Sequence, residues 1–435
     1  MNSKFILLLT LFMYFFQIKA QQPTLISKAE LAEKVAENNT NIKISEQSFL
    51  LANAEYRQTN AVFLPSITAS HTGISTTNPL MAFGSKLNQE ILTANDFNPD
   101  LLNDPDRIEN FATLLEFQLP LINVDGFYQR KAAKNKMEAM EYQTQRTREY
   151  LDFEVDKAYM QLQLAYKGVS VLEKALASAE ANLKLAEDNY KQGLLQKADV
   201  LAVEVRVSEV KNQLQAAKSQ VANASNYLSF LMNDKTYTIY TPTDSLKVNL
   251  EDFAVKETIS EERADVKAME LTIESYKSMN KSDKMAFLPR LNAFGSYAMF
   301  DQDIFQASAD GYTIGAQLTW NIFEGSKRFG KAQESKVAYE KSQLEYEQYV
   351  SQSQLELNKA NRRLADAKSK LELTALALEQ SKESLRIRTN RFKEGLEKTS
   401  DLLLAETQYA QKELEYYQTV FEYNYAQSYV KFLSN

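Results

Sequence analysis

The chain has 435 residues, of which 25% are charged and 44% are hydrophobic, and its formal net charge is −7. This balance is typical of a folded protein, and an acidic chain without a basic cluster is a poor partner for nucleic acid. Because there is no cysteine, disulfides, thiolate metal sites and a lipid-modified N-terminal cysteine are excluded. The small numbers of Gly and Pro, 11 and 8, predict long uninterrupted elements.

Residues 1–20 are predicted to be a secretory signal peptide. Lys4 precedes an apolar run from Phe5 to Phe16, and the small residue Ala20 marks the expected cleavage site. A membrane anchor is the alternative, but a run of twelve residues is short for crossing a bilayer. Since no later run approaches about 18 apolar residues, the exported chain is expected to be either soluble or a β-barrel.

The rest of the chain contains one unit of about 200 residues twice. The first copy is expected to span 21–233 and the second 258–435, joined by a linker at 234–257. The copies align at three places in the same order, namely 41–67 with 265–291, 118–126 with 317–325, and 190–204 with 392–406. Such a repeat predicts that both halves contain the same elements in the same order.

Each copy is predicted to open with a helix that ends at a proline. Ser27 in the first copy and Thr258 in the second are each followed three residues later by Glu, the pattern of a capping box. Pro65 and Pro289 then interrupt the helical pattern, because proline does not continue a helix interior. One unbroken helix is therefore expected before each of these prolines.

Two strands are predicted to follow in each copy, at about 65–75, 110–122, 290–301 and 311–323. Apolar and polar residues alternate in 114–122 and 313–322, which is the period of a strand with one apolar face. Pro65, Pro289, Gly126 and Gly325 mark the breaks between the helical and strand parts. The alternation fits a face on a soluble core as well as a face against lipid.

The first copy is longer than the second by 25 residues between these Pro and Gly landmarks. The extra residues lie in 78–107, where three prolines and Gly84 predict a long loop. The corresponding segment of the second copy, 301–310, is shorter.

Long helical patterns follow the strands, from Gln129 to Lys191 and from Lys327 to Lys393. Each would extend about 90 Å at 1.5 Å per residue, which favours a coiled coil. The returning helix of the first copy has Val, Leu and Ala at alternating spacings of three and four from Val200 to Leu231. The second copy places Lys412 and Thr419 in this seam, so its seam is expected to be looser or to face water in part.

Four strands are too few to close a barrel, because eight make the smallest packed one. Three copies would supply twelve strands and twelve helical passes, and a closed barrel is the only strand structure that spans a membrane. Aromatic residues near the strand ends have the spacing of interfacial girdles: Phe63, Phe111, Phe127, Phe287, Phe300, Tyr312, Trp320 and Phe323. A soluble strand platform with ordinary aromatic packing is the alternative.

In these features the sequence resembles the TolC-like outer membrane efflux proteins. The resemblance rests on the duplication, on Phe-Leu-Pro at 63–65 and 287–289, on the junction at 321–325, and on the Gly-x5-Asp-x-Leu motifs that begin at Gly193 and Gly395. It implies a mainly α chain with a β-barrel part, assembled as a homotrimer with a twelve-stranded barrel in the outer membrane of a Gram-negative bacterium and a long helical channel in the periplasm. The implied function is a passive exit duct of a tripartite efflux pump or a type I secretion system.

The resemblance also implies partners and sites. A periplasmic adaptor, or membrane fusion protein, and an inner-membrane transporter are the expected partners, besides outer membrane lipid. The expected tips, where the adaptor would make contact, are Gly193, Leu194, Asp199, Gly395, Leu396 and Asp401. The expected residues of a closed entrance are Asp401, Arg391, Arg388 and Glu394. The second aspartate of the family pattern is replaced by Leu404, so an acidic ring would be thinner or absent.

Both aspartates have a simpler interpretation as well. Asp199 and Asp401 lie at the start of returning helices, where the helix dipole favours a carboxylate. The second hairpin is the expected moving part of the entrance, because Lys412 and Thr419 weaken its seam and charged residues gather beside Gly395.

Catalysis is not expected. His71 is the only histidine, no sequence neighbour supplies a metal-binding partner, and its role stays open. No phosphate-binding loop, Gly-x-Ser-x-Gly motif or Cys/His cluster occurs, so neither a cofactor nor a resident metal is predicted. The alternative function is that of a periplasmic or secreted coiled-coil structural or adaptor protein without a membrane barrel.

Overall fold

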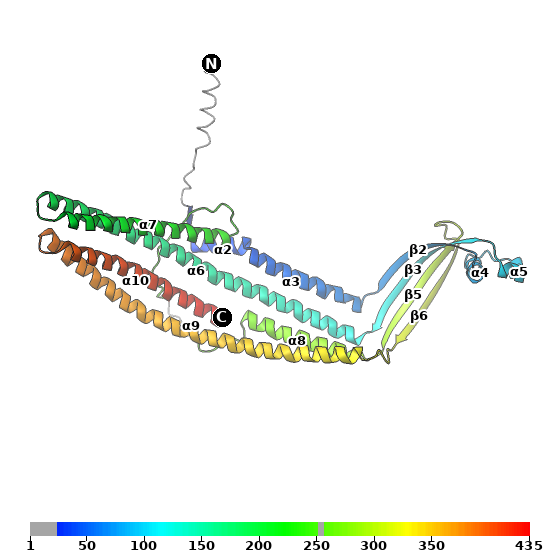
Figure 1. Cartoon of the computed structure of the whole chain (residues 1–435). Helices are drawn as coiled ribbons and strands as arrows, with labels where there is room; N and C mark the ends of the chain where they lie inside the picture. Colours follow the sequence, from blue (N-terminus) through cyan, green and yellow to red (C-terminus); the bar gives the residue numbers. More distant parts are fainter. Residues whose placement is uncertain (1–23, 251–255) are drawn as a thin grey trace, which may run out of the picture. The chain divides into compact units, whose positions relative to one another are not determined.

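The computed structural model describes residues 24–250 and 256–435 (Figure 1). The predicted signal peptide, 1–20, lies outside the described residues. The chain divides into two compact units. The hairpin unit comprises the described parts of 1–46, 143–264 and 349–435, and the sheet unit comprises 47–142 and 265–348.

The hairpin unit is built from long antiparallel helices. In the first copy α6 (Val124–Lys191) is followed by α7 (Lys197–Leu231), and in the second copy α9 (Lys327–Lys393) is followed by α10 (Thr399–Ser434). A short parallel pair, β1 (Thr24–Ile26) with β4 (Tyr240–Pro242), belongs to the same unit. Each returning helix is much longer than the average helix of globular proteins, and burial of its apolar seam stabilises it.

The first copy opens with two helices rather than one. α2 (Lys28–Asn38) begins after Ser27, whose side-chain oxygen accepts a hydrogen bond from the Glu30 amide at 3.1 Å. α3 (Thr40–Gln58) begins after Asn39, and the short 3₁₀ turn η2 (Thr59–Val62) follows it. The expectation of one unbroken helix was therefore wrong. Asn39 has an extended backbone, and its buried side chain donates to the Leu231 carbonyl at 2.8 Å.

In the second copy the opening helix starts later than predicted. α8 (Ala264–Met285) begins six residues beyond Thr258, so the capping box expected there was wrong. The Gln354 side chain of α9 holds the preceding segment instead, because it donates to the Glu257 carbonyl at 2.7 Å and accepts from the Ile259 amide at 3.2 Å.

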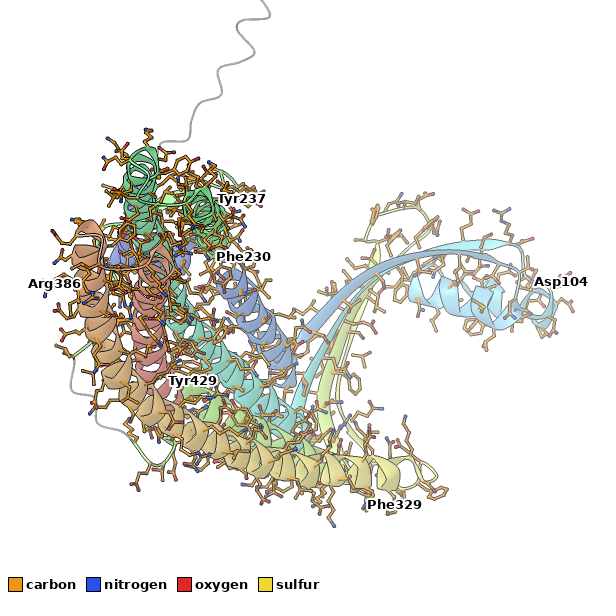
Figure 2. The ribbon with its side chains drawn as sticks, turned by 60° about the vertical axis from the view of Figure 1, so that its left-hand side comes forward. Asp104, Phe230, Tyr237, Phe329, Arg386 and Tyr429 are labelled. Carbon is orange, nitrogen blue, oxygen red and sulfur yellow. The ribbon has the colours of Figure 1, made fainter. Side chains whose placement is uncertain are left out.

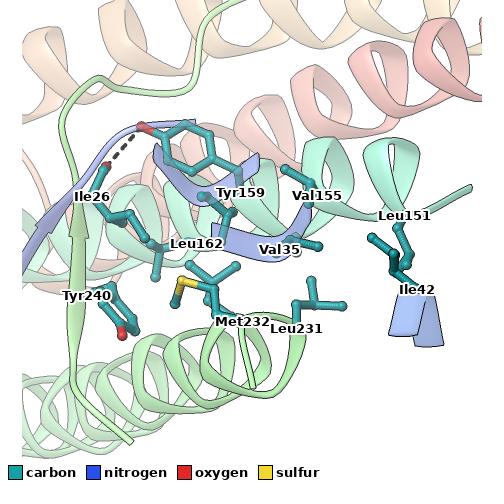
Figure 3. Close-up of a cluster of buried hydrophobic side chains, with 13 residues drawn as sticks. Ile26, Val35, Ile42, Leu151, Val155, Tyr159, Leu162, Leu231, Met232 and Tyr240 are labelled. Carbon is teal, nitrogen blue, oxygen red and sulfur yellow. Dashed lines mark hydrogen bonds between the residues drawn. The ribbon is translucent and has the colours of Figure 1, made fainter. Parts of the chain in front are cut away.

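Each hairpin has an apolar core of its own. In the first copy side chains from α2, α6, α7 and the β1–β4 pair meet around Leu31, Leu162 and Leu228, which are fully buried. Figure 3 shows part of this core, with Leu162 near Val35 and Tyr159. The Tyr159 hydroxyl donates to the Ile26 carbonyl at 3.4 Å at the edge of this core (Figure 3). In the second copy α9 and α10 meet at Leu357, Ala360, Leu364, Ala426, Val430 and Leu433. Burial of each Leu side chain contributes about 2 kcal/mol.

The two polar positions in the seam of α10 are less exposed to water than expected. Thr419 is fully buried, and its hydroxyl donates to the Glu415 carbonyl at 2.9 Å. Only Lys412 reaches water at these two positions, where its amine pairs with the Glu415 carboxylate at 2.8 Å.

The sheet unit contains a four-stranded antiparallel sheet in the order β2-β3-β5-β6. The strands are β2 (Ser66–Thr76), β3 (Ile108–Ile122), β5 (Arg290–Asp301) and β6 (Ala309–Thr319), with an irregularity between Pro120 and Ile122. β6 ends before Trp320, whose indole N–H donates to the Phe287 carbonyl at 3.0 Å. In the described part of the chain, no helix is both long and apolar enough to cross a membrane.

The segment expected as a long loop contains helices. α4 (Pro79–Asn88), the 3₁₀ turn η3 (Ala94–Phe97) and α5 (Pro99–Asn103) lie between β2 and β3. The side-chain oxygen of Asn78 caps α4 by accepting from the Met81 amide at 3.2 Å, and that of Asn98 caps α5 by accepting from the Asp100 amide at 3.1 Å. The prolines that follow these caps occupy the first helical position, where proline is favourable rather than disruptive.

Candidate functional site

The sheet has one apolar and one polar face. Because paired residues of neighbouring strands share a face, the register gathers one set of side chains, here called the apolar face: Ile67, Leu115, Phe117, Leu119, Tyr297, Tyr312, Ile314 and Leu318. The opposite set, here called the polar face, includes Thr68, Ser70, Glu116, Gln118, Asn292, Ser296, Thr313 and Gln317. Most of the large side chains on the apolar face are exposed in the single chain. An exposed apolar surface of this kind indicates contact with lipid or protein.

Both edges of the sheet are open within the described residues. β2 pairs only with β3, and β6 pairs only with β5. The outer backbone groups of β2 and β6 therefore have no strand beside them in the single chain, although such groups need hydrogen-bond partners away from water.

The helix-to-strand junctions lie in the sheet unit. Pro65 and Pro289 directly precede β2 and β5. Gly126 lies in the first turn of α6, where an added Cβ would come within 2.9 Å of the Val62 side chain. Gly325 has a φ of +61°, a conformation that glycine adopts readily, just before α9.

His71 lies on the apolar face. Its Nδ1 atom is 2.8 Å from the Thr113 hydroxyl oxygen, and its ring stacks on Phe305 with centroids 4.2 Å apart. No group of three or more His, Cys, Asp or Glu residues suited to a metal ion occurs among the residues the structure describes. The surroundings of His71 are those of a packed aromatic side chain.

The first tip joins α6 to α7. Gly193 has a φ of +76° and its amide donates to the Tyr190 carbonyl at 2.9 Å, as in a glycine-capped helix end. Leu194 is exposed, whereas Leu195 packs against a small core of Ala186, Val200 and Val203. Asp199 caps α7, because its carboxylate accepts from the Gln196 amide at 3.1 Å. This contact matches the simpler interpretation of Asp199.

The second tip joins α9 to α10 and is held by charge. Gly395 has a φ of +71°, and Leu396 is exposed beside it. Glu397 accepts hydrogen bonds from Arg388 at 2.7 Å and from Arg391 at 2.8 Å, and its side chain is only 10% exposed. Arg391 also donates to the Leu396 carbonyl at 3.2 Å, which closes the turn.

The carboxylate at the centre of the second tip is therefore Glu397 and not Asp401. Asp401 reaches only Arg388, at 3.9 Å, and Glu394 is exposed. Arg386 lies on the surface of α9 (Figure 2). Its guanidinium pairs with the Glu383 carboxylate at 2.7 Å. The sequence placed Glu397 near the turn, but its distances to the two arginines depend on how the turn folds back.

A buried polar contact between the two hairpins was missed by sequence reasoning. Glu406 of α10 lies almost fully buried and accepts hydrogen bonds from Ser178 at 2.7 Å and from Asn182, both on α6. Burial raises the pKa of the Glu406 carboxyl above its ordinary value of 4.5. The charge of Arg206, also buried, opposes this shift. In sequence Glu406 resembles any other charged residue of a solvated helix face.

A surface groove of about 830 Å³ runs along α9 next to the second tip. Its lining includes Ile387, Arg388, Arg391 and Glu397. Exposed leucines, charged pairs and this groove therefore lie together at the end of the second hairpin.

Comparisons with known proteins agree with these features. A family model described as outer membrane efflux protein matches residues 31–234 and 256–431. No curated protein sequence matches the chain significantly.

The fold is similar to that of solved membrane proteins. A membrane protein from Pseudomonas aeruginosa is 18% identical with a TM-score of 0.81, and the match covers 94% of this chain and 93% of that one. The outer membrane protein VceC from Vibrio cholerae is 16% identical with a TM-score of 0.78, covering 94% and 96%. The CmeC outer membrane channel from Campylobacter jejuni is 17% identical with a TM-score of 0.81, covering 94% and 85%. With the family model matching well over half of its residues, the chain belongs to the outer membrane efflux protein family.

Proposed function

We propose that this protein is an outer-membrane channel that serves as the exit duct of a tripartite efflux or type I secretion system. The observation that carries the proposal is the sheet, which has an exposed apolar face, a polar face and two open edges. Membership in the outer membrane efflux protein family and similarity to proteins described as outer membrane channels support it.

The sheet supports a homotrimer. Each chain supplies four strands, so three chains would give twelve, with β6 of one copy pairing with β2 of the next. In lipid every unpaired backbone group costs several kcal/mol, and closure would remove both open edges. The apolar face would then lie against outer membrane lipid and the polar face would line the duct.

The hairpins would form the periplasmic part, with no catalysis by the duct itself. The tips would be the contact for a periplasmic adaptor, because Leu194 and Leu396 are exposed at turns that begin with glycine caps. An inner-membrane transporter would energise the transport. We further propose that Arg388, Arg391 and Asp401, with Glu397 between them, hold the entrance closed.

A periplasmic or secreted coiled-coil adaptor is the less favoured function. A soluble platform would have to cover the apolar face, and within the described residues no helix packs on the central part of that face, where Ile314 and Leu318 are exposed.

Two measurements test the proposal. The protein should stay with outer membranes through carbonate and high-salt washes, and light scattering in mild detergent should give about three times the mass of one mature chain, which is the 49.6 kDa of the full sequence less residues 1–20. A protein that is released by the washes, or that is monomeric in mild detergent, contradicts the barrel.

A further inference from the structure

Helix α4 is fixed to the polar face of the sheet, at the strand ends remote from the helix junctions. The Gln89 side chain, 3% exposed, donates to the Asn110 side chain at 2.7 Å and to the carbonyls of Glu109 and Asp301 at 2.9 and 3.0 Å. Asn110 lies on the polar face, an even number of residues from Glu116 along β3. Gln89 thus anchors α4 to β3 and β5 together.

Burial along the polar face agrees with this placement. Ile108 and Ala309 are buried at the outer ends of β3 and β6, whereas Glu116 and Gln118 are exposed farther along β3. On α4 the buried residues are Ala82 and Ser85, which lie seven and four positions before Gln89 and therefore on the same side of the helix. Figure 1 shows α4 beside the ends of the strands.

The segment around α4 is folded rather than loose. The Lys86 amine pairs with the Asp96 carboxylate at 2.7 Å and links α4 to η3. That hydrogen bond from Lys86, with further ones from Thr93, holds the pKa of Asp96 well below its usual range. At the base of the segment Arg107 donates to the Ser75 hydroxyl at 2.7 Å.

The side of α4 turned away from the sheet is apolar and has no partner among the residues that the structure describes. Leu80 is 81% exposed and Leu87 is 55% exposed, and they are seven residues apart on one side of the helix. Gly84 lies between them, and an added Cβ there would meet nothing within 4 Å. A glycine inside a helix lowers helix stability relative to alanine, and the single chain offers no steric reason for it.

We infer that α4 is an internal lid, and that its Leu80–Leu87 side contacts the same helix in neighbouring copies of this chain to form an apolar constriction at the outer mouth. The inference rests on the proposed function. In a closed barrel with the apolar face outward, the polar face and the helix that covers it lie inside the wall. α4 also begins three residues after β2, the edge strand that would pair with β6 of the next copy. The Leu80–Leu87 side of α4 therefore lies close to the place where two copies would meet.

The test uses the absence of cysteine from the native chain. Single variants L80C and L87C are oxidised in outer membranes and examined on non-reducing gels. The matched control is I304C, because Ile304 is 60% exposed on the β5–β6 loop, whose Phe305 packs on the apolar face against His71. We expect covalent dimers from L80C or L87C and none from I304C.

A functional readout accompanies the gels. Oxidised L80C channels in planar bilayers should conduct at least twofold less than the same channels after reduction, while I304C should not respond to reductant. Oligomeric state is measured in parallel by light scattering on the unmodified protein.

The outcomes separate the lid from the channel. If the protein is oligomeric and conducts, but neither L80C nor L87C forms more dimer than I304C, the lid is refuted and the channel stands. If the protein is monomeric and does not conduct, the proposed function fails and the lid fails with it.

Discussion

Replacing Glu397 by Gln should loosen the second tip, because this carboxylate receives both arginines of the turn. The change keeps the size of the side chain and removes its charge. The side chains of Arg388 and Arg391 are 40% and 56% exposed, so water screens both pairs. Screened pairs contribute about 1 kcal/mol or less each, so the loss is at most about 2 kcal/mol per chain. That corresponds to at most roughly a 30-fold shift of a closed–open equilibrium.

Single-channel recording in planar bilayers measures this shift as a higher open probability or conductance. The control is D199N, which also removes one charge from a tip but keeps a good helix-capping side chain. R391A should behave like E397Q, whereas D401A should act more weakly, since Asp401 reaches only Arg388 at 3.9 Å. If E397Q matches the native channel, or if D199N opens it equally, the second tip does not hold the entrance.

Three further predictions follow from the described contacts. Because burial raises the pKa of Glu406, the folded hairpins favour its protonated form. Its contribution to stability is therefore full below pH 4.5 and is lost as pH rises through the raised pKa, which should appear as faster amide exchange in α6 and α10. E406Q should abolish this pH dependence, and an unchanged profile would contradict it. A tag inserted near Asn95 should be labelled on intact cells and one near Gly193 should not; the reverse pattern would invert the topology. G395A should destabilise the second turn by about 1 kcal/mol, because Gly395 has a φ of +71° that alanine adopts only with strain. G168A should instead stabilise α6 by up to about 1 kcal/mol, because a Cβ there meets nothing within 4 Å. Equal effects of the two variants on amide exchange would refute the role assigned to the positive φ of Gly395.

The long elements were predictable because their signals are periodic. The spacing of apolar residues in α7 follows from the seam, and the two glycines at the tips end long runs that contain no proline. The mainly helical chain with four strands was confirmed by the structure and by the family. Single residues that start or end helices, such as Pro, Asn and Thr, were less informative, because the same residue has different effects in different structural contexts.

Asn39 and Pro79 show why. Asn39 interrupts a helical pattern since its side chain reaches the Leu231 carbonyl, 192 residues away in the chain, and no local pattern contains that partner. Pro79 resembles a helix breaker in sequence but starts α4 behind the Asn78 cap. Thr258 has the pattern of a cap, yet Gln354 of a distant helix holds that segment in another conformation. The errors at Asn39 and Thr258 came from tertiary contacts that override a local preference, whereas the error at Pro79 came from a local cap.

The candidate site was harder to predict than the fold for the same reason. Glu397 and Glu406 look alike in sequence, as single acidic residues among many on helix faces. The turn brings Glu397 to two arginines of α9, and the packing of the hairpins brings Glu406 to Ser178 of α6. Asp401, which the resemblance emphasised, makes one long contact. The family pattern therefore pointed to Asp401 at this turn, whereas Glu397 makes the closer contacts there.

The two tips also differ in how their contacts respond to separation, and this difference favours the second hairpin as the moving part. The first tip packs Leu195 on Val200 and Val203, and such apolar contacts lose their stabilisation when water enters. The turn of the second is held by Glu397, whose arginine partners can exchange to water at little cost. Its motion would still break the packing of Leu403 on the first tip and the hydrogen bonds of Glu406 to α6, together a few kcal/mol. Adaptor binding at the exposed leucines of the tips would have to supply that amount.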